Sequence, residues 1–217
     1  HYCPWLSVEM ARANLLQFFK SPLKYLSLWL AIARGNAKSP KFLARAILIL
    51  PKAVQMAAEM KREGVAHIHA HYATHPALAA WIVHKLTGIP YSVTVHAHDI
   101  FVDRSMLELK LRDAVFVAAI SEYNRDFLAR HLGGWVREKI HVIHCGIEPG
   151  LYTGPSEDGD ASKLRVISIG SLQPYKGMQH LVEACALLRD RGIPVSCKIV
   201  GEGEERPRLE GLIAKYD

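Results

Sequence analysis

Cysteine is scarce in this chain of 217 residues: four are present, at positions 3, 145, 185 and 197, and no two form a CxxC pair. This spacing argues against a disulfide scaffold and a structural zinc ribbon, and it favours reduced thiols in a cytosolic compartment. Cys145 lies between His144 and Gly146, but no orienting network for a thiol nucleophile accompanies it. A cysteine-based enzyme is therefore not expected.

Long hydrophobic runs are also lacking. The most apolar N-terminal stretch, Pro22–Ala33, is interrupted by Lys24, and the run Ala44–Leu50 stops at Pro51. A membrane-spanning helix needs about 20 apolar residues, so no transmembrane span is expected. The chain begins with His1 rather than Met and shows no signal-peptide pattern. We therefore expect it to be a piece of a longer protein.

Several common catalytic motifs are missing as well. The sequence has no Walker loop, no GxGxxG fingerprint, no GxSxG elbow and no HExxH pair. These absences argue against a P-loop nucleotidase, an α/β-hydrolase and a zinc protease of the HExxH class. The candidate chemistry must therefore come from less common residue patterns.

Acidic residues are few at the N-terminus. Residues 1–64 hold ten Lys and Arg against three Glu, a net charge of +7, whereas the other 153 residues hold 17 basic and 18 acidic residues, a net charge of −1. Seven aromatic residues, among them Trp5, Phe19 and Trp29, lie in the basic region. Basic and aromatic residues on helices predict docking on an anionic membrane surface. The alternative is a solvated face beside an ordinary core stripe. No nucleic-acid motif is present, and we expect no nucleic-acid partner.

The order of predicted elements indicates an α/β fold. Apolar periodicity predicts helices over residues 9–33 and 41–63, with Pro51 kinking or dividing the second. Short apolar runs then alternate with helical segments. Predicted strands are 65–70, 91–95, 114–120, 140–143, 164–169 and 195–200; predicted helices are 76–86, 122–132, 178–191 and 204–215. This alternation predicts Rossmann-like parallel sheets with helices on both faces.

We divide the chain into four parts. Residues 1–64 are the basic helical part of the N-terminal domain, and 65–147 its Rossmann-like, acceptor-side portion. Residues 148–163, rich in Gly, Pro, Ser and Asp, are a linker. Residues 164–217 begin a second α/β domain that the sequence leaves incomplete.

Histidines gather where predicted strands end. His67, His69 and His71 alternate along one strand, so their imidazoles point to one face, and His96 and His98 follow the next strand, ahead of Asp99. In open parallel sheets the carboxyl ends of the strands border the ligand cleft. Two imidazoles can also converge on zinc. A zinc-dependent hydrolase using His69, His71, His96 and His98 is therefore an alternative to a metal-free pocket.

Two glycine-containing turns follow the strands of the second domain. Gly170-Ser171 begins the first turn and Lys176-Gly177 opens the next helix, where free N–H groups and a lysine charge could cradle a diphosphate. The segment Val200-Gly201-Glu202-Gly203 ends the next strand and suits a tight turn near the same ligand. The alternative for the first turn is an ordinary strand-to-helix connection with a solvated lysine.

Six segments in one order resemble glycosyltransferase family 4, in particular bacterial exopolysaccharide enzymes of the colanic-acid type. They are His69–Ala73, Gly88–Asp99, Ile120–Tyr123, Val142–Ile147, Gly170–Gly177 and Val200–Gly203. The resemblance implies a GT-B architecture. It also implies retaining transfer of a hexose from a UDP- or GDP-sugar, without an obligatory metal or other cofactor, to a lipid-linked saccharide or polysaccharide acceptor. An enzyme of cell-surface polysaccharide synthesis, peripheral at the cytoplasmic face of the membrane, is the expectation.

The resemblance also implies roles for particular residues. His96 matches the histidine at the donor sugar and Lys176 the lysine that neutralises the leaving diphosphate. Gly170, Ser171, Gly177, Gly201 and Glu202 are expected on the donor side, and His69, His71, His98 and Asp99 on the acceptor side.

The chain departs from the family pattern in three ways. Ser171 stands where many relatives have arginine, the glutamates of the ExxxxxxxE motif fall beyond Asp217, and the first strand with its glycine-rich loop does not precede the helices. We therefore assign the activity to the parent protein and expect the fragment alone to be inactive. A non-catalytic nucleotide-binding or membrane-associated scaffold remains the non-enzyme alternative.

Overall fold

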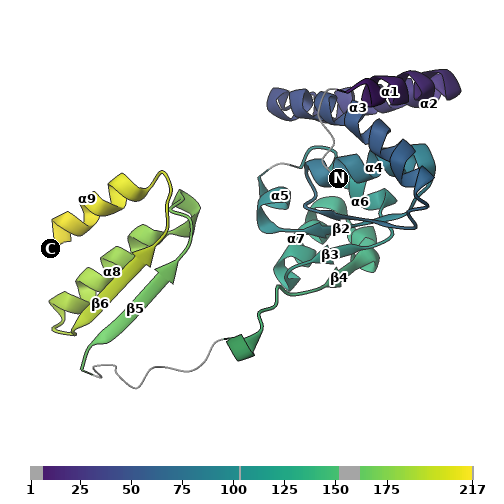
Figure 1. The fold of residues 1–217 in the computed structure, drawn as a ribbon. Helices are drawn as coiled ribbons and strands as arrows, with labels where there is room; N and C mark the ends of the chain where they lie inside the picture. Colours follow the sequence, from purple (N-terminus) through teal and green to yellow (C-terminus); the bar gives the residue numbers. More distant parts are fainter. Residues whose placement is uncertain (1–6, 103, 152–161, 217) are drawn as a thin grey trace. The chain divides into compact units, whose positions relative to one another are not determined.

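The computed structural model describes residues 7–102, 104–151 and 162–216. The chain forms two compact units, His1–Ile147 and Glu148–Asp217, and each is an α/β structure (Figure 1). Of the expected linker 148–163, residues 152–161 lie outside the described residues; the short 3-10 helix η2 (Pro149–Leu151) precedes them.

The N-terminal unit contains a four-stranded parallel sheet in the order β1-β2-β3-β4. Its strands are β1 (Ile68–His71), β2 (Tyr91–Val95), β3 (Val117–Ala119) and β4 (Ile140–Val142), connected through α4 (His75–Thr87), α5 (Ala97–Phe101), α6 (Leu107–Asp113), α7 (Glu122–Leu132) and the 3-10 helix η1 (Gly134–Lys139). Local residues set the helix ends. Gly88 ends α4 in the left-handed conformation at φ 80°, and the Ser121 hydroxyl caps α7 by accepting the Asn124 N–H at 3.2 Å.

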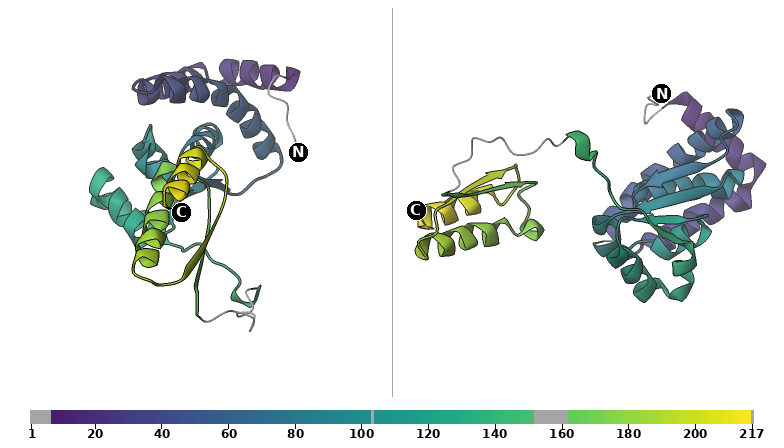
Figure 2. Two further views of the ribbon diagram at one scale, coloured as in Figure 1. Left: turned by 90° about the vertical axis from the view of Figure 1, so that its left-hand side faces the viewer. Right: turned by 90° about the horizontal axis from the view of Figure 1, so that it is seen from below.

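The connecting helices lie on one face of this sheet. Because the strands follow each other in sequence order, every right-handed crossover returns on the same side. The core there is formed by side chains such as Val93, Val95 and Val117, which are fully buried. The parallel strands and connecting helices agree with the prediction. Helices were predicted on both faces of the sheet, whereas the helices of the described residues lie on one side of it. The other face carries polar and aromatic side chains, including His69 and Thr94, and faces the viewer in the right-hand view of Figure 2.

Three helices precede the sheet and form a further layer on its helical side (Figure 1): α1 (Val8–Lys20), α2 (Pro22–Asn36) and α3 (Pro40–Arg62). The single helix expected over 9–33 is wrong, because the chain leaves the helical conformation at Ser21 (φ −154°, ψ 70°) and restarts with Pro22 in the first turn. α3 continues through Pro51, so it is not divided there. The Asn14 amide of α1 donates to the Pro51 carbonyl at 2.9 Å and ties the two helices together.

No helix among the described residues is long and apolar enough to cross a bilayer. The layer of α1–α3 attaches to the sheet mainly through α3, whose buried side chains Leu50, Ala53, Val54 and Ala57 pack against α4.

The C-terminal unit pairs β5 (Leu164–Ile169) with β6 (Val195–Val200) in parallel, next to α8 (Met178–Asp190) and α9 (Arg206–Tyr216). The 3-10 turn η3 (Pro174–Lys176) precedes α8. Both strands occupy the residues predicted for them. A small core of Leu172, Met178, Val182 and Leu209 holds the helices to one face, while Ile167 and Ile169 on the other face are exposed.

Candidate active site

His71 and His96 meet at the carboxyl end of the N-terminal sheet. His71 ends β1, and His96 directly follows β2, its neighbour in the sheet. Their Nε2 atoms are 2.9 Å apart, so the N–H of one imidazole donates a hydrogen bond to the unprotonated nitrogen of the other. His71 is exposed and His96 half-buried. Two predicted site residues are thus brought into direct contact.

Tyr72 supports this pair and was not among the predicted site residues. Its backbone has φ 82°, an uncommon value for a bulky side chain, and its N–H donates to the Thr94 carbonyl at 3.0 Å. Its ring lies 4.5 Å from the His96 ring and 5.3 Å from the His71 ring, measured between centroids. The turn after β1 therefore holds an aromatic surface against the imidazoles.

Asp99 joins the loops that follow β1 and β2. Its carboxylate accepts the backbone N–H of Ala73 and, at 2.7 Å, that of His96, forming a capping box at the start of α5. The residue is only 1% exposed. Burial raises the pKa of Asp99, and the hydrogen bonds from the two N–H groups partly oppose this rise. Asp99 therefore fixes the position of His96, and its acceptor-side role stays a prediction.

His69 and His98 lie apart from the His71–His96 pair. His69 points to the sheet face not covered by the described helices, with Nδ1 2.7 Å from the Ser92 hydroxyl and Nε2 2.8 Å from the Thr94 hydroxyl. Burial, and then the neighbouring imidazoles of His71 and His67, lower the pKa of His69. His98 is exposed on α5. The four predicted histidines do not converge on one point.

This arrangement bears on the zinc alternative. In the ranges that the structure describes, no group of three or more His, Cys, Asp or Glu residues is placed to hold a metal ion. His69 bonds to two hydroxyls and His71 to His96, which leaves the strand-end histidines without a shared centre. The zinc-hydrolase hypothesis therefore has no support in this geometry.

In the C-terminal unit, the turn between β5 and α8 presents the predicted diphosphate-binding groups. Gly177, at φ 68°, caps α8 without a side-chain hydrogen bond. The His180 N–H donates to the Gly177 carbonyl at 3.0 Å, which leaves the N–H groups of Met178 and Gln179 at the open end of this 13-residue helix. Lys176 is exposed, and its ammonium lies 5.6 Å from the centre of the neighbouring Tyr175 ring. No described carboxylate forms an ion pair with it. Positive charge therefore stands at the start of α8.

The second glycine turn has a structural cause. A side chain at Gly201 would overlap the Gly170 carbonyl, and one at Gly203 would overlap the Leu172 carbonyl. The Leu172 N–H donates to the Glu202 carbonyl at 2.9 Å, so the two turns are joined backbone to backbone. The Glu202 side chain pairs with Arg206 of α9. The glycines thus allow the turn after β6 to support the turn that carries Gly170.

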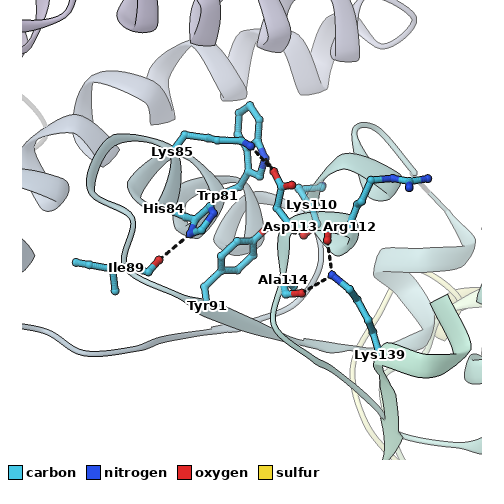
Figure 3. Close-up of polar contacts among 10 residues, drawn as sticks. All are labelled: Trp81, His84, Lys85, Ile89, Tyr91, Lys110, Arg112, Asp113, Ala114 and Lys139. Carbon is cyan, nitrogen blue, oxygen red and sulfur yellow. Dashed lines mark hydrogen bonds and ion pairs between the residues drawn. The ribbon is translucent and has the colours of Figure 1, made fainter. Parts of the chain in front are cut away.

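The amino end of the N-terminal sheet holds a different polar network (Figure 3). The Asp113 carboxylate pairs with the Lys85 ammonium at 2.7 Å and accepts a hydrogen bond from the Trp81 indole N–H at 2.8 Å. Burial raises the pKa of Asp113, but the hydrogen bonds from Lys85 and Trp81 outweigh it and leave that pKa below its ordinary value. The Tyr91 hydroxyl donates to the Lys110 carbonyl, and burial raises the pKa of Tyr91. These contacts are made at the end of the sheet away from the histidine pair.

Comparison with known families assigns the chain. The model of Glycosyltransferase Family 4 matches residues 18–151, more than half of the sequence. The chain belongs to glycosyltransferase family 4. A second model, of the glycosyl transferases group 1, matches residues 156–217, so this family 4 chain carries both sequence regions in order.

Curated relatives of this glycosyltransferase chain are longer than it is. It is 26% identical to the 2-deoxystreptamine glucosyltransferase of Streptomyces kanamyceticus over 64% of its own length and 42% of that protein. It is 32% identical to the putative colanic acid biosynthesis glycosyltransferase WcaL of Escherichia coli K12, over 38% of the chain and 20% of WcaL. It is 33% identical to the amylovoran biosynthesis glycosyltransferase AmsK of Erwinia amylovora, over 39% of the chain and 21% of AmsK. The chain spans less than half of each relative.

Among solved structures, the glycosyltransferase chain is similar to the crystal structure of TarM, with a TM-score of 0.59 at 13% identity over 76% of the chain and 34% of TarM. A second TarM structure is that of a mutant in complex with fondaparinux, α-GlcNAc-glycerol and UDP. Its TM-score is 0.54 at 14% identity, over 76% of the chain and 34% of TarM. At such identities the likeness concerns the fold alone. It confirms the expected fold class, GT-B.

Proposed function

We propose that the parent protein of this chain is a retaining glycosyltransferase that moves a hexose from a nucleotide diphosphate sugar to a lipid-linked saccharide or polysaccharide acceptor in cell-surface polysaccharide synthesis. The observation that carries this proposal is the match of two glycosyltransferase family models, one after the other, over nearly all of residues 18–217. Relatives named for colanic acid and amylovoran biosynthesis support the polysaccharide product. The UDP bound to the TarM mutant supports a nucleoside diphosphate donor.

On the donor side, we assign the diphosphate to the turn before α8. Breaking the bond between sugar and phosphate builds negative charge on the departing diphosphate. Lys176 supplies a full positive charge, and the N-terminus of α8 supplies oriented N–H groups. Gly170, Ser171 and Gly177 line this turn, while Gly201 and Glu202 support it through the backbone bond to Leu172.

On the acceptor side, the proposal uses the carboxyl end of β1 and β2. His96 would contact the donor sugar, and His71, bonded to it at 2.9 Å, would set the imidazole's orientation. Asp99 would hold the His96 backbone, and His69 and His98 would bind acceptor hydroxyls beside the pair. No step in this proposal requires a metal ion. The proposed location is the inner face of the membrane, where a lipid-linked acceptor would be met.

The test uses the full-length protein and a panel of UDP- and GDP-sugars, with released nucleotide as the readout. We expect turnover with one donor, and a decrease of at least tenfold for Lys176→Ala, because a charge-assisted contact contributes about 1.5–3 kcal/mol. Lys198→Ala, another exposed lysine of the same unit, is the control and should leave turnover unchanged. Unchanged turnover in Lys176→Ala would remove this lysine from the site. Failure of UDP and GDP to bind at millimolar concentration would favour the scaffold instead.

A further inference from the structure

Helix α1 exposes an apolar face opposite the partly buried face that it turns towards α3. Met10, Asn14 and Gln17 face inward, and Asn14 is anchored to Pro51 of α3. At the opposite helical positions lie Val8, Arg12, Leu15 and Phe19, spaced by four, three and four residues. Val8 is 80% exposed and Phe19 73%. The outer face of α1 thus combines large apolar side chains with one arginine.

Helix α2 repeats the arrangement. Leu28, Ile32 and Asn36 are buried at four-residue spacing, and Asn36 donates to the Ile32 carbonyl at 2.9 Å. Leu23 and Leu30 lie on the opposite side, with Arg34 beside them on the same face. Leu23 is 84% exposed, the highest value among the large apolar side chains of the described residues. A solvent-facing helix would normally place polar residues at these positions.

Charge on these helices has one sign. Between Ser7 and Ala58 there are eight Lys and Arg and one acidic residue, Glu9. In the part of the chain that the structure describes, no carboxylate pairs with Arg12, Lys24 or Arg34. Arg12 and Arg34 therefore border the apolar faces without a carboxylate partner among the described residues. A complementary partner would be both anionic and apolar.

The place of the two helices agrees with such a partner. α1 and α2 lie in the outermost layer of the N-terminal unit, on the side of α3 and α4 away from β1–β4 (Figure 1). Neither helix is able to span a bilayer. Helices with an apolar face and a basic border lie in the plane of the membrane interface and insert their apolar side chains among the lipid headgroups.

We infer that the outer faces of α1 and α2, defined by Val8, Leu15, Phe19, Leu23 and Leu30, dock on the surface of an anionic bilayer, with Arg12 and Arg34 contacting lipid phosphates. This deepens the proposed function, on which it rests for the identity of the acceptor, because a lipid-linked saccharide is reached at that surface. The docking itself requires no donor, acceptor or turnover. Its failure is therefore distinguishable from failure of the catalytic proposal.

The test is sedimentation of the full-length protein with vesicles, without nucleotide sugar. Vesicles of phosphatidylglycerol and phosphatidylethanolamine are compared with vesicles of phosphatidylcholine alone, at low and high salt. We expect binding to the anionic vesicles, at least tenfold weaker binding to the neutral ones, and weakening of the anionic binding by salt. Equal binding to both vesicle types, or none, would overturn the proposal.

Two pairs of variants separate the apolar from the charged contribution. Phe19→Ser with Leu23→Ser should lower the vesicle partition coefficient at least tenfold at every salt concentration, since both side chains lose insertion. Its control is Val115→Ser, an exposed apolar residue outside α1 and α2. Arg12→Gln with Arg34→Gln should lower the partition coefficient about tenfold at low salt and less at high salt. Its control is Arg165→Gln with Lys198→Gln, two exposed cations of the C-terminal unit.

The same variants distinguish other occupants of these faces. If the faces joined two copies of the chain, Phe19→Ser with Leu23→Ser would convert a dimer to a monomer in light scattering and leave vesicle binding intact. That result would overturn the proposal. Retained folding is checked by the circular dichroism melt, which surface substitutions of this kind should leave nearly unchanged.

Discussion

The two ends of the N-terminal sheet use polar side chains in opposite ways. At the amino end, Asp113 is held by both Lys85 and Trp81, and the Tyr91 hydroxyl donates to a carbonyl of α6 (Figure 3). At the carboxyl end, His71 and His96 bond to each other at the surface, and Tyr72 holds an uncommon backbone conformation beside them. At the amino end the polar side chains have protein partners. At the carboxyl end the two imidazoles lie at the surface, where they can also contact a ligand.

This difference indicates which end was shaped for stability and which for a ligand. Buried polar groups stabilise a fold when each has a partner, as Asp113 has. A non-glycine residue with φ 82° costs about 1–3 kcal/mol, and such strain is concentrated at functional sites. Ligands of parallel α/β sheets bind at the carboxyl ends of the strands, which is the end where this strain is found.

Replacing one histidine at each end is the strongest test of this contrast. His96→Ala should lower turnover of the full-length enzyme about tenfold to a hundredfold, with little change in melting temperature. His84→Ala at the amino end should do the reverse, because His84 Nδ1 lies 2.9 Å from the Ile89 carbonyl and holds a turn. Its expected cost is about 1 kcal/mol of unfolding free energy, with turnover unchanged. A large loss of stability in His96→Ala would instead make His96 a core residue.

Removing the carboxylate of the amino end should give the next largest effect. Asp113→Ala leaves the buried Trp81 N–H without its acceptor, and we expect a loss of about 1–3 kcal/mol in urea unfolding with turnover unchanged. In a Trp81→Phe background the same substitution should cost less, since no indole N–H is then stranded. An equal cost in both backgrounds would show that the Trp81 contact contributes nothing.

Much of the fold was predictable because local patterns decide it. β5, β6 and α7 were predicted at the residues that they occupy, since each is bounded by glycine or by a serine cap and has a clear apolar pattern. The break at Ser21 was not predicted, because the apolar periodicity of α1 and α2 runs on across Pro22 and hides it. The strand order, and hence the placing of the connecting helices on one side of the sheet, is a nonlocal property.

The candidate site was predictable in its location and not in its contacts. Strand-end histidines identified the sheet edge where the pair lies, but nothing in their spacing distinguishes His71, which bonds to His96, from His69, which bonds to Ser92. Tyr72 was missed because a positive φ leaves no mark when the residue is not glycine. The sequence also does not show why position 201 is glycine. A side chain there would overlap the Gly170 carbonyl, and only the folded turn brings these two residues together.

The contact between the two histidines gives a further test of the carboxyl end. His71→Ala should lower turnover less than His96→Ala, because in our proposal it acts by orienting the other ring. In a His96→Ala background it should have almost no further effect, which is the mark of a coupled pair. His71→Gln keeps a hydrogen-bonding group and should recover part of the loss. Additive losses in the double variant would show that the two residues act separately.

The smallest expected effects concern pH, and they have opposite signs at the two ends. Folding lowers the pKa of Asp113 below its ordinary value of 3.8. The stability that Asp113 contributes is therefore present above pH 3.8 and is lost as the pH falls through the lowered pKa. The pKa of Asp99 is raised, so the native state binds the extra proton, and stability declines as the pH rises through the window above 3.8. Urea unfolding between about pH 3 and 6 should show Asp113→Asn losing less stability than the wild type towards acid. Asp99→Asn should remove the decline above 3.8 instead. If both variants changed the pH slope in the same direction, the two carboxylates would not differ as the surroundings of each end require.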